Sequence, residues 1–233
     1  MIGNGVLRRT ALGAALVLAA LGAQAQGPRP PQAYKEGKDY LRIEPAVSLG
    51  PVAKGKVEVV EFFWYGCPHC YRLQKPWEKW LEANGKLIDY KPQPAVLGRS
   101  WELMARAYHS MVAVGGFDKG LHRSFFDGIH EKALPLQTLE SDEPVKLYEY
   151  VAERKGADYG AKFKKEYMSF GIAAKIAKDR ETQKLFQLQG TPTIVVAGKY
   201  SVNPSQAGTE DNMVPIVDFL VKKAHAEAKA AGK

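Results

Sequence analysis

The chain has 233 residues, of which 45% are hydrophobic and 25% charged, and its formal net charge is +8. These are ordinary values for a globular protein, and the length allows a packed core without disulfide staples. The basic residues are spread along amphipathic segments without interleaved aromatic residues, so the composition gives no reason to expect nucleic-acid binding.

The first 25 residues have the pattern of a secretory signal peptide. Arg8 and Arg9 supply the positive start, residues 11–20 form an apolar stretch, and Ala23-Gln24-Ala25 is a small-x-small cleavage site. The alternative, a membrane anchor, is disfavoured because a spanning helix needs roughly 20 apolar residues. We predict cleavage after Ala25, which leaves 208 residues and a net charge of +6, because the leader carries two arginines and no acid. Such a leader indicates the bacterial periplasm, where disulfides persist.

The first part of the mature chain is predicted to form a strand, a helix and a second strand. Residues 26–41 are rich in Pro, Gly, Lys and Gln, and we expect an arm that precedes the core. Val57–Phe63 is a β-branched and aromatic run typical of a buried central strand. Cys70–Leu81 predicts a helix with a kink at Pro76, and Leu87–Tyr90 predicts the second strand. Two prolines are expected to stop that strand: Pro92 and Pro94.

The stretch from residue 100 to 189 predicts helices only, and strands return after it. The expected helices are 100–114 with Ser100 as cap, 118–133, 141–155, 158–170 and 172–188. The expected later elements are a strand 193–196, a turn 197–199, a strand 200–202 and a helix 212–230. This order predicts one α/β sheet domain, formed by residues 26–97 and 190–233, with a helical domain inserted at 98–189.

The two cysteines of the chain stand three apart, as Cys67-Pro68-His69-Cys70, directly after the first predicted strand. If the two sulfurs pair, the bond closes so small a loop that it constrains the unfolded chain little. A strand that runs into such a pair at the start of a helix is the arrangement that makes one sulfur reactive. We therefore interpret the chain as a thiol–disulfide exchange protein. A metal-binding module of Cys67, His69 and Cys70 is the alternative, but the sequence offers no fourth ligand nearby.

The chain resembles the DsbA-like thiol:disulfide oxidoreductases, which are periplasmic members of the thioredoxin superfamily. The resemblance covers most of the mature chain and is carried, in order, by Val59–Phe63, Cys67–Tyr71, the helical insertion, Gly190–Thr193 and Gly198–Tyr200. It implies an α/β thioredoxin fold with an inserted α-helical domain, a redox-active Cys67–Cys70 disulfide, and no metal or other cofactor. Two departures are Thr191, where many members carry Val, and Pro76 inside the active-site helix.

The resemblance implies distinct roles for the four residues of the motif. Cys67 is the expected attacking sulfur, and its place in the first turn of a helix favours the thiolate, which makes the disulfide oxidising. The DsbA-like family is the standard example of an oxidising pair with a low thiol pKa, so the resemblance by itself already implies an oxidising disulfide. Cys70 is the expected resolving thiol and should be more buried. His69 is expected to donate a hydrogen bond or positive charge to the Cys67 sulfur, and Pro68 to hold the turn; alternatively both are neutral residues of an exposed turn.

A second implied feature is a cis peptide bond between Thr191 and Pro192. In the family this bond packs beside the disulfide, and the residue before the proline offers its backbone to an extended substrate strand. The alternative is an ordinary trans proline, since cis forms are only about 5–6% of X–Pro bonds in folded proteins.

Glu61 is the unusual residue in an apolar strand. The family places an acid here beneath the buried cysteine, which implies that Glu61 moves protons to and from Cys70. Because an unpartnered buried acid is costly, Lys86 and Lys91 are candidate partners. In the alternative reading Glu61 points to water at the end of the strand.

The resemblance implies a periplasmic oxidase that transfers its disulfide to exported proteins during oxidative folding. It also implies reoxidation by a membrane quinone reductase of the DsbB type. A reductase or isomerase of the same fold is the main alternative, although isomerases usually add a dimerisation domain for which residues 26–40 are too short. We expect a monomer, because no association surface can be read from the sequence.

Overall fold

The computed structural model describes residues 34–131, 134 and 144–232, and the structural statements below refer to these residues. The predicted signal peptide, with Arg8, Arg9 and the cleavage after Ala25, lies outside them. None of the described helices combines the length and apolarity that crossing a bilayer requires.

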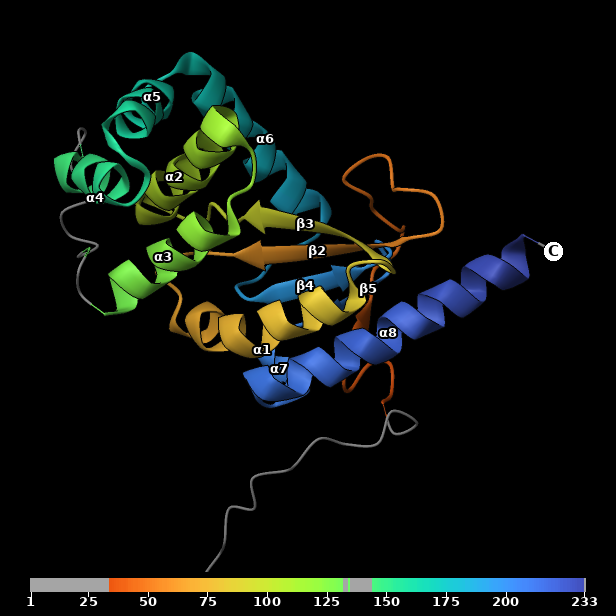
Figure 1. The fold of residues 1–233 in the computed structure, drawn as a ribbon. Coiled ribbons are helices and arrows are strands. Elements are labelled where there is room, and N and C mark those ends of the chain that lie inside the picture. Colours follow the sequence, from red (N-terminus) through yellow and green to blue (C-terminus); the bar gives the residue numbers. More distant parts are fainter. Residues whose placement is uncertain (1–33, 132–133, 135–143, 233) are drawn as a thin grey trace, which may run out of the picture.

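The core of the fold is a five-stranded sheet in the order β1-β5-β4-β2-β3 (Figure 1). All seven residues of β2 (Val57–Phe63) are buried, as predicted for a central strand. It pairs in parallel with β3 (Ile88–Pro94) and antiparallel with β4 (Thr193–Val196). The hairpin strand β5 (Tyr200–Val202) follows, and β1 (Leu41–Arg42) closes the other edge. The strand β2 therefore ends, and the cysteine motif begins, at the centre of the sheet.

The prediction that Pro92 and Pro94 stop the second strand is wrong, because β3 runs through both prolines. The strand lies at the edge of the sheet and pairs only with β2. Ala95, the residue after β3, donates its N–H to Phe63 O at 2.8 Å. Backbone N–H groups alternate in direction along a strand, so the backbone nitrogens of positions 92 and 94 face away from β2. A proline costs no ladder hydrogen bond at such positions.

Helices α1 (Pro68–Asn84) and α8 (Glu210–Ala231) cover one face of the sheet (Figure 1). The other face is covered by the segment 43–49 and by Phe186, which pack against the β2 side chains of that face. Helix α1 begins two residues before its predicted start, since Cys67 is the N-cap and a proline suits the first helical position. It continues through Pro76.

The prediction of an N-terminal arm that precedes the core is wrong for its described part. Tyr34 and Tyr40 are only 7% and 5% exposed, and their rings lie 5.6 and 6.3 Å from that of Phe219 in α8. The short strand β1 directly follows them, and the sequence did not predict it. The segment is mostly polar, which is why its sequence suggested an arm. Two aromatic side chains are nevertheless enough to anchor it to the core. The short helix α7 (Pro204–Ala207) was also not predicted.

Five helices lie between β3 and β4 in the sequence and gather at one end of the sheet (Figure 1). They are α2 (Arg99–Gly115), α3 (Lys119–His130), α4 (Val145–Lys155), α5 (Ala157–Tyr167) and α6 (Phe170–Leu185). The described residues between β3 and β4 contain no strand, as predicted. The predicted cap at Ser100 is wrong, because Gly98 is the N-cap and supplies no side-chain hydrogen bond. The predicted start of α4 at 141–143 lies outside the described residues.

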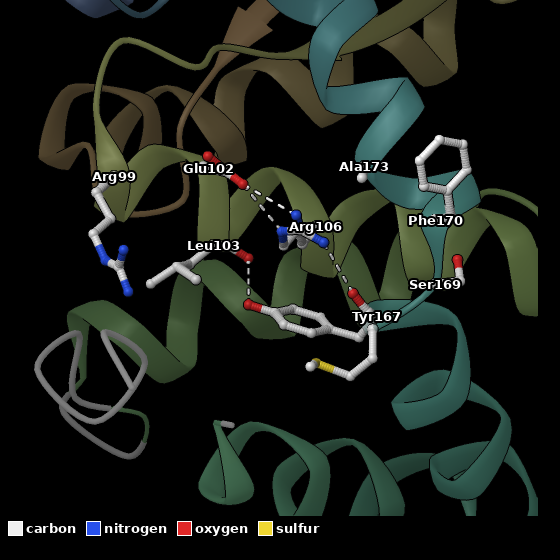
Figure 2. Close-up of a pocket in the computed structure, with 9 residues that line it drawn as sticks. Arg99, Glu102, Leu103, Arg106, Tyr167, Ser169, Phe170 and Ala173 are labelled. Carbon is white, nitrogen blue, oxygen red and sulfur yellow. Dashed lines mark hydrogen bonds and ion pairs between the residues drawn. The ribbon is translucent and has the colours of Figure 1, made fainter. Parts of the chain in front are cut away.

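Polar contacts join α2 to α5 and α6 around a hollow of about 470 Å³ (Figure 2). Arg106 donates to Glu102 and, at 3.2 Å, to the carbonyl of Tyr167. The Tyr167 hydroxyl donates to Leu103 O at 3.1 Å. Arg180 donates to Glu102 at 2.6 Å. These contacts fix the helical insertion internally.

Replacing Tyr167 by Phe is expected to lower the free energy of unfolding by about 1 kcal/mol, the usual net contribution of one such hydrogen bond. The ring is 1% exposed and stays packed, so only the bond to Leu103 O is lost. Urea unfolding of the variant and the parent measures the difference. An unchanged midpoint would show that the hydroxyl finds equal solvation in the unfolded chain.

Candidate active site

The two cysteines occupy the junction between β2 and α1, and both carry free thiols in this structure. Cys67 is the N-cap of α1, and its sulfur accepts a hydrogen bond from Cys70 N at 3.4 Å. Cys67 is 6% exposed, whereas Cys70 is fully buried. Cys67 is therefore the more accessible of the two thiols, in agreement with the predicted order of burial.

The surroundings shift the pKa values of the two thiols in opposite directions. A hydrogen bond from the Cys70 side chain is the largest influence on Cys67, and it lowers the pKa of that thiol to about 5 against the opposing effect of burial. The backbone N–H groups of Cys70 and His69 add to the effect, as expected at a helix N-terminus. Burial, followed by the interaction with Cys67, raises the pKa of Cys70 well above its usual value. Near neutral pH one sulfur is thus a thiolate and the other a thiol.

The Thr191–Pro192 peptide bond is cis and lies against the Cys67 sulfur. Cys67 Sγ is 3.3 Å from Thr191 O. A hollow of about 230 Å³ opens beside this bond, and its lining comes from His69 and from residues 189–192 and 203–205. The backbone that precedes the proline is therefore placed where a polypeptide that reaches Cys67 would pass.

Glu61 is fully buried in β2, so the reading in which it points to water is wrong. Three neutral donors bind its carboxylate: Gln74 Nε2 at 3.3 Å, Trp77 Nε1 at 2.7 Å, and the Tyr90 hydroxyl. Burial raises the pKa of Glu61 to about 7, although these three hydrogen bonds oppose the shift. Gln74 and Trp77 follow Cys70 at helical spacing, so Cys70 and both donors share the face of α1 that packs on the sheet.

Comparison with known proteins places this site in a family. No protein-family model matches the chain. The chain is 34% identical to the thiol:disulfide interchange protein DsbA of Azotobacter vinelandii over 221 residues, which cover 93% of this chain and 98% of that protein. The chain belongs to the DsbA family of thiol:disulfide interchange proteins. It is accordingly an enzyme, a thiol:disulfide oxidoreductase.

Further relatives agree with this assignment. DsbA of Pseudomonas aeruginosa is 33% identical over 200 residues, covering 84% of this chain and 88% of that protein. The crystal structure of Pseudomonas aeruginosa DsbA matches with a TM-score of 0.74 at 29% identity, covering 85% of this chain and 98% of the other. The predicted fold class is confirmed: the DsbA-family chain has a thioredoxin fold with an inserted helical domain.

The imidazole of His69 contacts two side chains that the sequence did not predict as its partners. Its Nδ1 contacts Glu210 at the start of α8, and Arg72 lies 2.8 Å away. Arg72 Nη2 also donates to Glu210 at 2.6 Å. The predicted bond from the imidazole to the Cys67 sulfur is not among the described hydrogen bonds. The backbone N–H of His69 is what acts on Cys67, while Pro68 occupies the first position of α1.

The predicted partnership of Glu61 with Lys86 or Lys91 is wrong. Lys91 binds Glu58 at 2.6 Å, and no ion pair joins Lys86 to Glu61 among the described residues. The register explains the choice, because Lys91 pairs with Val60 and so shares its face with Glu58. Glu61 points to the opposite face, where the donors are uncharged.

The described part of the DsbA-family chain holds no group of three or more His, Cys, Asp or Glu side chains arranged for a metal ion.

Proposed function

We propose that this protein is a periplasmic oxidase that transfers its Cys67–Cys70 disulfide to exported proteins as they fold. The proposal is carried by the unequal pair of thiols, one with its pKa lowered to about 5 and one raised. A stabilised thiolate stabilises the dithiol form, so the disulfide is easily given away. We assign residues 26–97 and 190–233 to the catalytic domain and residues 98–189 to the helical domain.

The transfer proceeds in two exchanges. A client thiolate attacks Cys67 Sγ, a mixed disulfide forms, and the Cys67–Cys70 bond breaks with its electron pair on Cys70. The second client thiolate then attacks the client sulfur of the mixed disulfide and releases Cys67 as a thiolate. The client has lost two electrons and the enzyme has gained them. A low pKa makes Cys67 the better leaving group in the second exchange.

Glu61 serves the first exchange as proton donor to Cys70. Its pKa of about 7 lets the carboxyl hold a proton near neutral pH, and Cys70 has a raised pKa and so needs that proton when it leaves. The backbone of Thr191, ahead of the cis Pro192, binds the client as an added strand. His69 borders the same hollow, and its backbone N–H favours the thiolate of Cys67. A DsbB-type membrane quinone reductase restores the disulfide.

The reduction potential of the purified mature chain, measured against glutathione, tests this function. We expect an oxidising couple that remains a dithiol in mixtures where ordinary protein disulfides persist. A potential near that of thioredoxin, about −270 mV, would identify a reductase and overturn the proposal.

A pH titration of the reduced protein gives a second, independent result. Ultraviolet absorbance is expected to show a thiolate that is present at neutral pH and lost as the pH falls through about 5. An ordinary cysteine would lose its thiolate already near pH 8.5. A midpoint in that ordinary range would leave the oxidase without its physical basis.

A further inference from the structure

The turn that leads into Cys67 begins at Trp64, and the indole of Trp64 packs against the turn. Cys67 N donates to Trp64 O at 2.9 Å, which ties the two ends of the segment between β2 and α1. The Trp64 indole lies across Gly66, where an added Cβ would come within 2.4 Å of an indole carbon. No real Cβ contact is that short, so Gly66 can carry no side chain while the indole keeps this place.

The helical insertion supplies the second contact of this indole. Trp101, in the first turn of α2, stacks on Trp64 with a centroid separation of 4.5 Å and an interplanar angle of 8°. Both rings are partly buried. Trp64 Nε1 is buried and has no hydrogen-bond partner among the described residues, so stacking and packing, rather than a hydrogen bond, set the position of the ring.

We propose that Trp101 is a positioning residue for the reactive thiol. By stacking on Trp64 it holds the turn that presents the Cys67 sulfur to the N–H groups of α1. The hydrogen bond from Cys70 N to that sulfur spans 3.4 Å and depends on where the turn places Cys67, so a displacement of the turn weakens it. The helical insertion thereby sets the thiolate preference of Cys67 without touching the sulfur. This inference rests on the proposed function of Cys67.

Trp101→Ala and Trp101→Phe test the stacking contact. We expect Trp101→Ala to lower the ratio of thiolate to thiol at Cys67 about threefold at a fixed pH near the midpoint, and to stabilise the disulfide against glutathione by a similar factor. Trp101→Phe keeps an aromatic face and should recover most of both. The control is Val151→Ala, which removes a fully buried side chain elsewhere in the insertion and lowers stability. It should leave the Cys67 midpoint unchanged.

A Gly66→Ala cycle gives a measurement that does not depend on the stability of the Trp101 variants. In the parent, the new methyl group meets the stacked indole and should raise the Cys67 midpoint. In a Trp64→Ala background the obstacle is absent, so the same substitution should have little effect. Equal shifts in both backgrounds would overturn the inference, as would a Trp101→Ala protein with the parental midpoint.

The parent protein separates this inference from the proposed function. If its Cys67 titrates as an ordinary thiol, the proposed function fails. If the parent has the low midpoint and Trp101→Ala keeps it, only the role of Trp101 fails.

Discussion

Cys67→Ser is expected to reduce the rate of dithiol oxidation at least about a thousandfold, towards the uncatalysed rate. A serine hydroxyl cannot form the disulfide, and the other thiol is fully buried, so no thiol remains accessible to a client. Oxidation of a peptide with two thiols, followed by the loss of free thiol, measures the rate.

Cys70→Ser should fail in a different manner that identifies the roles of the two sulfurs. This variant keeps the accessible thiolate of Cys67 but has no internal thiol to displace a bound partner, so mixed disulfides should accumulate with oxidised clients or glutathione. Non-reducing gels and mass spectrometry detect them. Tyr167→Phe, which alters only the helical insertion, serves as the control and should keep the parental rate. Mixed disulfides that form in Cys67→Ser and not in Cys70→Ser would show that the roles are reversed.

The placement of the reactive pair could be predicted from the sequence because it depends on local patterns. Apart from Glu58 and Glu61, Val57–Phe63 consists of valine and phenylalanine, and a β-branched and aromatic run of this kind favours a buried central strand. The cysteines follow it directly, and a proline after Cys67 suits the first position of a helix. Together these features fix an N-terminal sulfur and a sulfur one turn inward.

The surroundings of the pair could not be predicted, because they depend on register and on distant segments. Glu61 and Glu58 differ by three positions on a strand and therefore point to opposite faces, so only the pairing with β3 decides which of them meets Lys91. The contact of His69 with Glu210 spans 141 positions, and no motif announces it. In the same way, the stacking of Trp101 on Trp64 depends on how the insertion docks.

The second large effect is expected at Glu61, where Glu61→Gln should stabilise the protein above neutral pH by about 3 kcal/mol. Between pH 4.5 and about 7 the folded parent binds a proton at Glu61 that the unfolded chain has released. The free energy of unfolding of the parent therefore falls as the pH rises through this window. Glutamine is isosteric, stays neutral and can still accept from Trp77 and Tyr90, so the variant should not show this loss.

The difference in the free energy of unfolding between the parent and Glu61→Gln, followed against pH, isolates the contribution of Glu61. The thiolate of Cys67 contributes the opposite trend in the reduced protein, because its lowered pKa makes stability rise with pH from about 5 upwards. Both proteins carry Cys67, so that contribution cancels when urea unfolding is compared at several pH values.

Glu58→Gln is the matched control, since it makes the same chemical change in the same strand on the opposite face. Glu58 is 2% exposed and is bound by Lys91 at 2.6 Å, so its replacement leaves a partly buried ammonium with only the 3.8 Å carboxylate contact to Asp89. That variant should lose stability at neutral pH, whereas Glu61→Gln should gain it. If both substitutions destabilise the protein, or if Glu61→Gln keeps the parental dependence on pH, Glu61 is charged in the folded protein. It could then not donate a proton to Cys70 near neutral pH.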